Sequence, residues 1–176
     1  PGAGGLAAGG YRAAAIDAAA QLPAAGTVLS GPLKIAVAGA GGRMGHMLVE
    51  AVAAADDCRL GGALDMPGSP ALGSDPLAAL GRSSEVRVTA DLHVGLSDAD
   101  VLIDFTRPEG TLAHLAVCHE LGVRAVIGTT GFSDAQKAQI AEHARHIAIV
   151  MAPNMSLGVN VVLKLLDVAA RALAQG

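Results

Sequence analysis

"VAGAGGRMGHMLVEA", residues 37–51, sets a cluster of glycines between a short apolar run and a segment rich in helix-forming residues. The run that leads into it, Lys34–Ala38, has the pattern of a buried strand. Across Met44–Ala55 apolar residues recur near helical spacing, at Met47, Leu48, Val52 and Ala55. The glycines are therefore predicted to form a turn between a strand and a helix. There, free N–H groups and the positive end of the helix dipole can hold a pyrophosphate.

The glycines of this turn have distinct expected roles. Gly39 would permit the tight turn, and Gly41 or Gly42 the close approach of a ligand to the backbone. Gly45, without a side chain, would let the helix pack near the sheet. The spacing is GxxGxxG rather than GxGxxG, because Met44 occupies the sixth place. In a chain with 23 glycines such a motif alone is weak, but its place between strand and helix favours dinucleotide binding over a chance cluster.

The remaining sequence alternates between strand-like and helix-like segments. Further strands are predicted at Arg59–Leu64, Glu85–Thr89, Val101–Phe105, Val123–Ile127 and Ile147–Met151. Helices are predicted at Pro108–Leu121 with Gly122 as its C′ residue, from the Ser133/Gln136 capping box to about His146, and at Leu157–Ala174. Residues 66–84 are rich in proline, glycine and serine, which predicts an irregular connection with one helical turn near Pro76–Leu80. Strands joined through helices indicate parallel crossovers, and hence a Rossmann-like, doubly wound α/β sheet.

Polar residues follow several of the predicted strands, at the edge where ligands bind in open parallel sheets. Asp65 comes 20 residues after Gly45, where a carboxylate can accept hydrogen bonds from the adenosine ribose. It could also be an ordinary solvated residue at a strand end. A carboxylate there disfavours a 2′-phosphate and so favours NADH over NADPH, but only mildly, because Arg43 could pair with that phosphate. The other strand ends carry Phe105-Thr106-Arg107, Gly128-Thr129-Thr130-Gly131 and Ala152-Pro153-Asn154-Met155.

These strand ends offer suitable groups for a nicotinamide or a substrate. Gly128 and Gly131 permit close backbone approach, the threonine hydroxyls donate and accept, and Asn154 offers an amide. Taken alone, "GTTG" could equally be no more than a tight turn.

Composition excludes several classes of partner. The net charge is −4 with no basic stripe, so nucleic acid is not an expected partner. Mean hydropathy is +0.47, yet no stretch of 18 apolar residues is free of glycine or charge, so no membrane span is predicted. Cys58 and Cys118 lie far apart and fit a reducing, cytoplasmic location.

The histidines give no predicted metal site. His143 and His146 lie three residues apart and could form a metal pair, but a solvated helix face is the favoured interpretation. His114 and His119 fall on a predicted covering helix, so both are interpreted as structural. The Ala- and Gly-rich residues 1–32 are expected to be a disordered or cloning-derived leader.

Four motifs in order, "KIAVAGAGGRMG", "VLIDFTRPEGTLAHL", "VIGTTGF" and "APNMSLGVNVVLKLL", resemble the N-terminal part of the bacterial dihydrodipicolinate reductase family. The resemblance covers about Leu33 to Leu173. It implies reduction of 4-hydroxy-tetrahydrodipicolinate, a cyclic dicarboxylate imine, to tetrahydrodipicolinate in lysine and diaminopimelate biosynthesis. Hydride would come from NADH or NADPH.

The same resemblance implies the cofactor-binding residues. Asp65 would hold the ribose, and the pyrophosphate would lie on Gly39, Ala40, Gly41, Gly42, Arg43 and Met44. The nicotinamide side would be lined by Gly128, Thr129, Thr130, Ala152, Pro153, Asn154 and Met155. Two positions depart from the family pattern: Met66 stands where some members have an arginine for the 2′-phosphate, and Met155 where many have an aromatic residue. Both leave the choice between NADH and NADPH open.

The resemblance also implies a domain organisation. Residues 33–153 would form the dinucleotide-binding domain, and residues 154–176 the hinge and first helix of a truncated α+β domain for substrate binding and tetramerisation. The His-His-x-x-Lys and Ser-Gly-Thr stretches with which the family protonates and holds its substrate do not occur in this sequence. No catalytic residue is therefore expected in this chain, which by itself is expected to bind dinucleotide weakly or not at all and to be inactive.

Two alternatives of other classes stay open. One is a non-catalytic module that senses NAD(H), because a fold alone does not fix chemistry. The other is a CoA-binding module, which also uses a glycine-rich first turn, although Asp65 suits NAD better than the 3′-phosphate of CoA.

Overall fold

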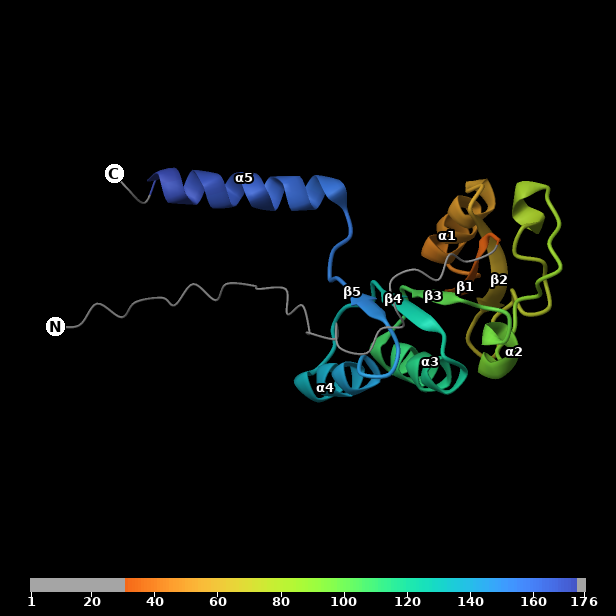
Figure 1. Cartoon of the computed structure of the whole chain (residues 1–176). Helices are drawn as coiled ribbons and strands as arrows, with labels where there is room; N and C mark the ends of the chain where they lie inside the picture. Colours follow the sequence, from red (N-terminus) through yellow and green to blue (C-terminus); the bar gives the residue numbers. More distant parts are fainter. Residues whose placement is uncertain (1–30, 174–176) are drawn as a thin grey trace.

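The computed structural model describes residues 31–173, and in them five parallel strands form one sheet (Figure 1). In spatial order these are β2 (Cys58–Leu64), β1 (Leu33–Ala38), β3 (Val101–Asp104), β4 (Arg124–Ile127) and β5 (Ile149–Met151). The helices are α1 (Arg43–Ala54), η1 (Ala78–Leu80), α2 (Leu92–Leu96), α3 (Pro108–Leu121), α4 (Asp134–His143) and α5 (Leu157–Leu173). The predicted leader, except its last two residues, and the predicted end of the last helix at Ala174 lie outside the described residues.

Helices pack on both faces of the sheet, as the continuous apolar strands predict. Successive residues of β1 point to opposite faces. Ile35 and Val37 join the apolar cluster that α1 completes through Val49 and Val52. Ala36 and Ala38 join the cluster on the other face, which receives Leu96 of α2, Leu115 of α3 and Ile140 of α4. Figure 1 shows α1 on one side of the strands and α2, α3 and α4 on the other, which confirms the doubly wound sheet.

Local signals place α3 and α4. Pro108 occupies the first turn of α3, and Gly122 ends the helix in the left-handed region at φ 72°. The capping box of α4 is complete: the Ser133 hydroxyl accepts from the Gln136 N–H, and the Gln136 side chain accepts from the Ser133 N–H. The prediction that α4 continues to His146 is wrong, because the helix ends at His143 and the chain turns there.

The prediction of a strand at Glu85–Thr89 is also wrong, so the described sheet has five strands rather than six. Only Thr89 bridges to β2, through Leu64. The backbone of Val88 instead exchanges hydrogen bonds with Gly73 and Ser74 in the preceding connection. The sequence pattern gave no sign of this pairing, nor of the short helix α2, whose N-cap Asp91 accepts from the Val94 N–H.

The Asp75 carboxylate ties together several residues of this connection. It accepts from the N–H groups of Leu77 and Ser84 at 2.9 and 2.7 Å and from Arg87 at 3.1 Å. The backbone hydrogen bonds from Ser84 and Leu77 outweigh burial and hold the pKa of Asp75 far below its usual value. Asp75 therefore stays ionised and fixes the loop that carries residues 85–89.

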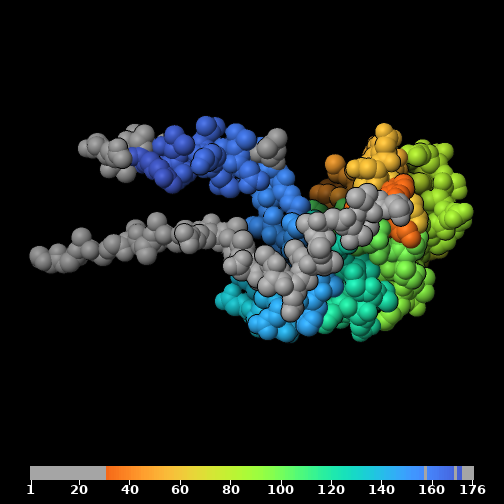
Figure 2. Space-filling view, viewed as in Figure 1, coloured from red at the N-terminus to blue at the C-terminus, as the bar shows by residue number. Residues whose placement is uncertain are grey.

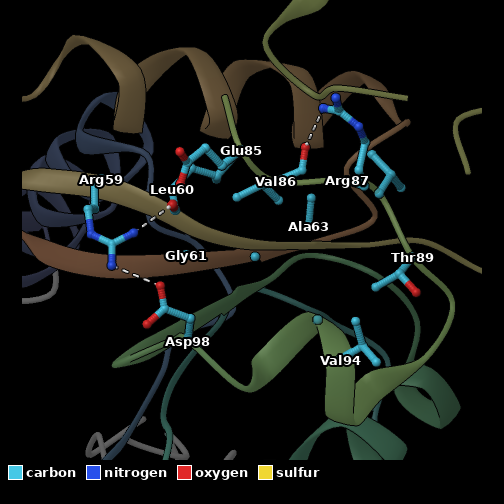
Figure 3. A pocket seen from close by; sticks show the side chains of 13 residues that line it. Arg59, Leu60, Gly61, Ala63, Glu85, Val86, Arg87, Thr89, Val94 and Asp98 are labelled. Atoms are coloured by element: carbon cyan, nitrogen blue, oxygen red, sulfur yellow. Dashed lines mark hydrogen bonds and ion pairs between the residues drawn. The ribbon is translucent and has the colours of Figure 1, made fainter. Parts of the chain in front are cut away.

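A groove of about 700 Å³ lies along β2, between this strand, residues 85–89 and α2 (Figure 3). Its walls are β2, the 85–89 segment and α2, and Figure 3 shows Arg59 paired with Asp98 at one end. The groove is lined by Arg59, Leu60, Gly61, Gly62, Ala63, Glu85, Val86, Arg87, Val88, Thr89, Val94, Gly95 and Asp98. It runs along the sheet edge, so it is distinct from the carboxyl ends of the central strands.

The helix α5 leads away from the sheet (Figures 1 and 2). Its apolar side chains are exposed, namely Val159, Val161, Val162, Leu163, Leu165, Leu166 and Val168. None of the helices in residues 31–173 is long and apolar enough to cross a membrane.

Three imidazole rings meet where α3 and α4 end. The ring of His119 stacks on that of His146, with centroids 4.3 Å apart, and meets His143 edge-on at 5.5 Å. The Nδ1 atom of His143 is buried and has no hydrogen-bond partner in the described residues. Burial, followed by the neighbouring His119 and His146, lowers the pKa of His143, which Glu142 only partly opposes. These contacts favour a neutral His143 in the folded chain.

We expect the free energy of unfolding of the chain to decrease as the pH is lowered, because of His143. Its folded pKa is below the ordinary 6.5, so the unfolded chain takes up the proton first as the pH falls through that value, and stability is lost below it. Urea unfolding at pH 7.5 and at pH 5.5 measures this loss. His143→Gln should flatten the dependence and His46→Gln, at an exposed position on α1, should not. An equally steep pH dependence in His143→Gln would contradict the assignment.

Candidate functional site

The carboxyl ends of the strands lie at one edge of the sheet, and the connections that leave the neighbouring strands β1 and β3 there pass to opposite faces. After β1 the chain passes to α1 on one face, and after the neighbouring β3 it passes to α3 on the other. In open parallel sheets this divergence creates a crevice in which ligands bind. The loops that follow β1, β3, β4 and β5 all begin at this edge.

The glycine-rich turn has the predicted strand-to-helix geometry. Gly39 has φ 69°, and its carbonyl accepts from the Gly42 N–H at 2.9 Å. A Cβ on Gly45 would lie 2.0 Å from the Gly39 oxygen, so only glycine lets α1 start this close to β1. Ala40 is buried, and its N–H donates to the Leu64 carbonyl.

No side chain of the described residues caps the N-terminus of α1. Its N-cap is Gly42, which has no side chain, and its first turn contains no acidic residue. Arg43 and Met44 are exposed at this end of the helix. The first turn therefore presents backbone N–H groups and the positive end of the dipole, which together suit an anion.

Asp65 lies beside this turn, directly after β2. Its carboxylate accepts from the Gly41 N–H at 3.0 Å, from the Met66 N–H at 2.8 Å and from the Ser69 hydroxyl at 2.9 Å. The structure thus brings Asp65 and the glycine turn together as predicted. The N–H of Gly41 donates to Asp65 and that of Gly42 donates to the Gly39 carbonyl, and neither hydrogen bond was predicted from the sequence.

The loop after β4 places its two threonines differently. Thr129 is buried, and its hydroxyl accepts from Thr111 at 2.9 Å, whereas Thr130 is exposed. A Cβ on Gly128 would lie 2.0 Å from the Phe105 ring, so the absent side chain lets this aromatic ring pack on the loop. Only Thr130 of the pair has a side chain open to a ligand.

The loop after β5 continues the same edge. The Ala152 N–H donates to the Ile127 carbonyl at 3.2 Å, which keeps the loop beside β4. The Asn154 side-chain oxygen accepts from the Ser156 N–H at 2.9 Å, so part of its amide orients the entry to α5. Pro153 and Met155 are exposed.

Sequence reasoning missed a polar cluster below these loops. Asp104, the last residue of β3, is fully buried and bonded to His114 of α3 at 2.8 Å. The available signal was an acidic residue inside an apolar strand, "VLIDF", because a carboxylate is seldom buried without a partner. His114, interpreted as structural, is that partner.

The fold and this edge define a class of protein. A parallel sheet covered on both faces, with a glycine turn leading into an uncapped helix at the point of divergence, is the arrangement of Rossmann-like nucleotide-binding domains. A family model described as "Dihydrodipicolinate reductase, N-terminus" matches residues 33–155. The chain belongs to this family.

Individual relatives and a solved structure with the same family name are also similar to this chain. The 4-hydroxy-tetrahydrodipicolinate reductase of Cupriavidus pinatubonensis is 62% identical over 144 residues, which cover 82% of this chain and 54% of the relative. That of Nitrosomonas europaea is 54% identical over 145 residues, with the same coverage. The dipicolinate-bound dihydrodipicolinate reductase of Paenisporosarcina sp. TG-14 is 31% identical with a TM-score of 0.62, covering 79% of this chain and 54% of that structure. The chain spans about half the length of the curated relatives it matches.

Proposed function

We propose that residues 33–153 bind NADH or NADPH in the crevice at the carboxyl ends of the strands. The single observation that carries the proposal is the uncapped first turn of α1, packed against β1 through Gly45 and flanked by the Asp65 carboxylate. A pyrophosphate fits the exposed N–H groups, and a ribose fits a neighbouring carboxylate.

The contacts support a division of roles along the crevice. The turn from Gly39 to Met44 would hold the pyrophosphate, chiefly through the first turn of α1, because Gly41 and Gly42 already donate within the protein. Asp65 accepts three hydrogen bonds of the roughly four that a carboxylate can take, which leaves capacity for one ribose hydroxyl. Gly128 to Thr130 and Ala152 to Met155 would line the nicotinamide side.

We further propose that the chain carries the cofactor part of a 4-hydroxy-tetrahydrodipicolinate reductase of lysine biosynthesis. The bound nicotinamide would supply hydride to a cyclic dicarboxylate imine. The loops that follow β1, β3, β4 and β5 offer backbone and hydroxyl groups for positioning, and none of these four described loops contains a histidine or a lysine.

The chain spans about half the length of the matched relatives, and we propose that their other half supplies the groups that hold and protonate the substrate. Residues 154–176 would then be the hinge and first helix of that second domain, consistent with the outward course of α5 in Figure 1. We propose a cytoplasmic homotetramer as the working assembly.

Replacing Asp65 tests the cofactor proposal. The test protein is a chimera in which residues 33–176 continue into the remaining half of the Cupriavidus pinatubonensis relative. Asp65→Ala is expected to weaken NADH binding by about 10-fold or more, because a hydrogen bond to a charged group contributes roughly 1.5–3 kcal/mol. Binding of NADPH should weaken less, because its 2′-phosphate no longer meets a carboxylate. Isothermal titration calorimetry measures both.

Asp56→Ala is the matched control, because Asp56 is another aspartate next to β2 but lies exposed at the strand's opposite end. Its affinities should equal those of the unmodified chimera. A folded chimera that binds neither NADH nor NADPH at millimolar concentration would overturn the proposed function.

A further inference from the structure

A buried carboxylate lies under the crevice at the end of β3. Asp104 has no exposed surface, and three residues direct hydrogen bonds to it. Its Oδ1 atom accepts from the Thr106 N–H at 2.8 Å, from the Thr106 hydroxyl at 2.6 Å and from the Thr129 hydroxyl at 3.3 Å. Its Oδ2 atom contacts Nδ1 of His114 at 2.8 Å.

His114 keeps this carboxylate charged. Burial acts to raise the pKa of Asp104, but the hydrogen bond from His114 and its charge, together with the hydrogen bonds from Thr106, lower the pKa overall. An ionised carboxylate only accepts hydrogen bonds, so Nδ1 of His114 must carry the proton in this contact. Removing His114 would leave a buried charge without its main partner, which is costly.

The network joins two loops that bind different parts of the dinucleotide in the proposed function. The glycine turn would hold the pyrophosphate, and the loop after β4 would line the nicotinamide. Thr106 lies against the glycine turn, because a Cβ on Gly39 would be 3.1 Å from its methyl group. Thr129 belongs to the loop after β4, next to the exposed Thr130, and also accepts from Thr111 of α3. A single carboxylate therefore sets the position of one loop relative to the other.

We propose that Asp104, oriented by His114, is a positioning residue that holds the Gly128–Thr130 loop in place for the nicotinamide end of the cofactor. It has no exposed surface and does not touch the ligand, so it acts through Thr129. This inference rests on the proposed function and deepens it. It predicts that breaking the network harms hydride transfer more than it harms binding of the adenosine end.

Variants of His114 and Thr129 in the chimera test the proposal. His114→Leu removes the donor to Asp104, whereas His114→Asn places an amide N–H near the position of Nδ1. Thr129→Val removes only the hydroxyl from a side chain of the same shape. We expect His114→Leu and Thr129→Val to lower kcat about 10- to 100-fold, because displacement of a positioned group by about 1 Å can cost that much. His114→Asn should recover most of the loss.

Two further readouts separate positioning from a general loss of structure. Affinity for ADP-ribose, which lacks the nicotinamide, should stay within about twofold of the unmodified chimera in all three variants. The acidic limb of the pH–kcat profile should move to higher pH in His114→Leu, because the Asp104 carboxylate then takes up a proton more readily. His119→Asn, at an exposed position on the same helix, serves as the control and should change neither kcat nor the pH profile.

The outcomes distinguish this inference from the proposed function. If the unmodified chimera binds no NADH or NADPH, the proposed function fails. If it turns over normally and His114→Leu and Thr129→Val match it in kcat and pH profile, the positioning role is overturned. Equal losses of ADP-ribose and NADH affinity would also overturn it. Should His114→Leu not fold, Thr129→Val, which leaves the contact between His114 and Asp104 intact, decides the matter.

Discussion

Gly45→Ala in the chimera is expected to weaken NADH binding by at least about 100-fold. The new Cβ would lie 2.0 Å from the Gly39 oxygen and 2.7 Å from the Ala40 Cα, whereas Cβ atoms essentially never approach other atoms within 3.0 Å. Both neighbours are backbone atoms, so the turn itself must move, and a displacement near 1 Å can cost about 10²-fold in function. Overpacking of this kind also costs about 1–3 kcal/mol of stability. Calorimetric titration and urea unfolding measure the two effects.

Gly158→Ala is the matched control, because it makes the same substitution in the first turn of another helix. A Cβ at Gly158 would meet nothing closer than the Ser156 hydroxyl at 3.9 Å. Alanine is favoured over glycine in a helix by up to about 1 kcal/mol, so stability should stay equal or rise. Gly45→Ala binding NADH as tightly as Gly158→Ala would show that the close approach of α1 to β1 does not shape the site.

The second large effect concerns turnover. The 176-residue chain alone is expected to reduce the cyclic imine at least about 100-fold more slowly than the chimera. General acid catalysis contributes roughly 10²- to 10⁴-fold, and substrate positioning contributes more. The loss of NADH absorbance at equal protein concentration measures both rates. Comparable rates would refute the proposal that the relatives' other half holds and protonates the substrate.

The sequence was sufficient to predict the helices α3 and α4 because the signals for them are local. Pro108 and Gly122 mark the two ends of α3, and Ser133 with Gln136 marks the start of α4; each acts through hydrogen bonds or backbone angles within a few residues. The strand at residues 85–89 was wrongly predicted for the opposite reason. Its apolar alternation is genuine, but Val88 pairs with Gly73 and Ser74, and the alternation alone does not show that these residues compete with β2 for its backbone.

The candidate site was predicted in outline but not in its hydrogen bonding. The structure brings the glycine turn, Asp65 and the loops after β4 and β5 to one edge, as the order of strands and helices requires. Periodicity could not show that Asp65 engages the Gly41 N–H or that Thr129 points inward. Nor could it pair Asp104 with His114, because ten residues and a helix start separate them in sequence.

The central place of β1 has a consequence for synthesis of the protein. Both of its partners come later in the chain, β2 from residue 58 and β3 from residue 101, and crossovers rather than hairpins join them. At a translation rate of about 5–20 residues per second, β1 waits several seconds at the ribosome before both of its edges can be paired. The apolar run of Leu33–Ala38 is then open to wrong partners, so a chaperone that shields nascent chains would be expected to raise the yield of folded protein more than one acting after release.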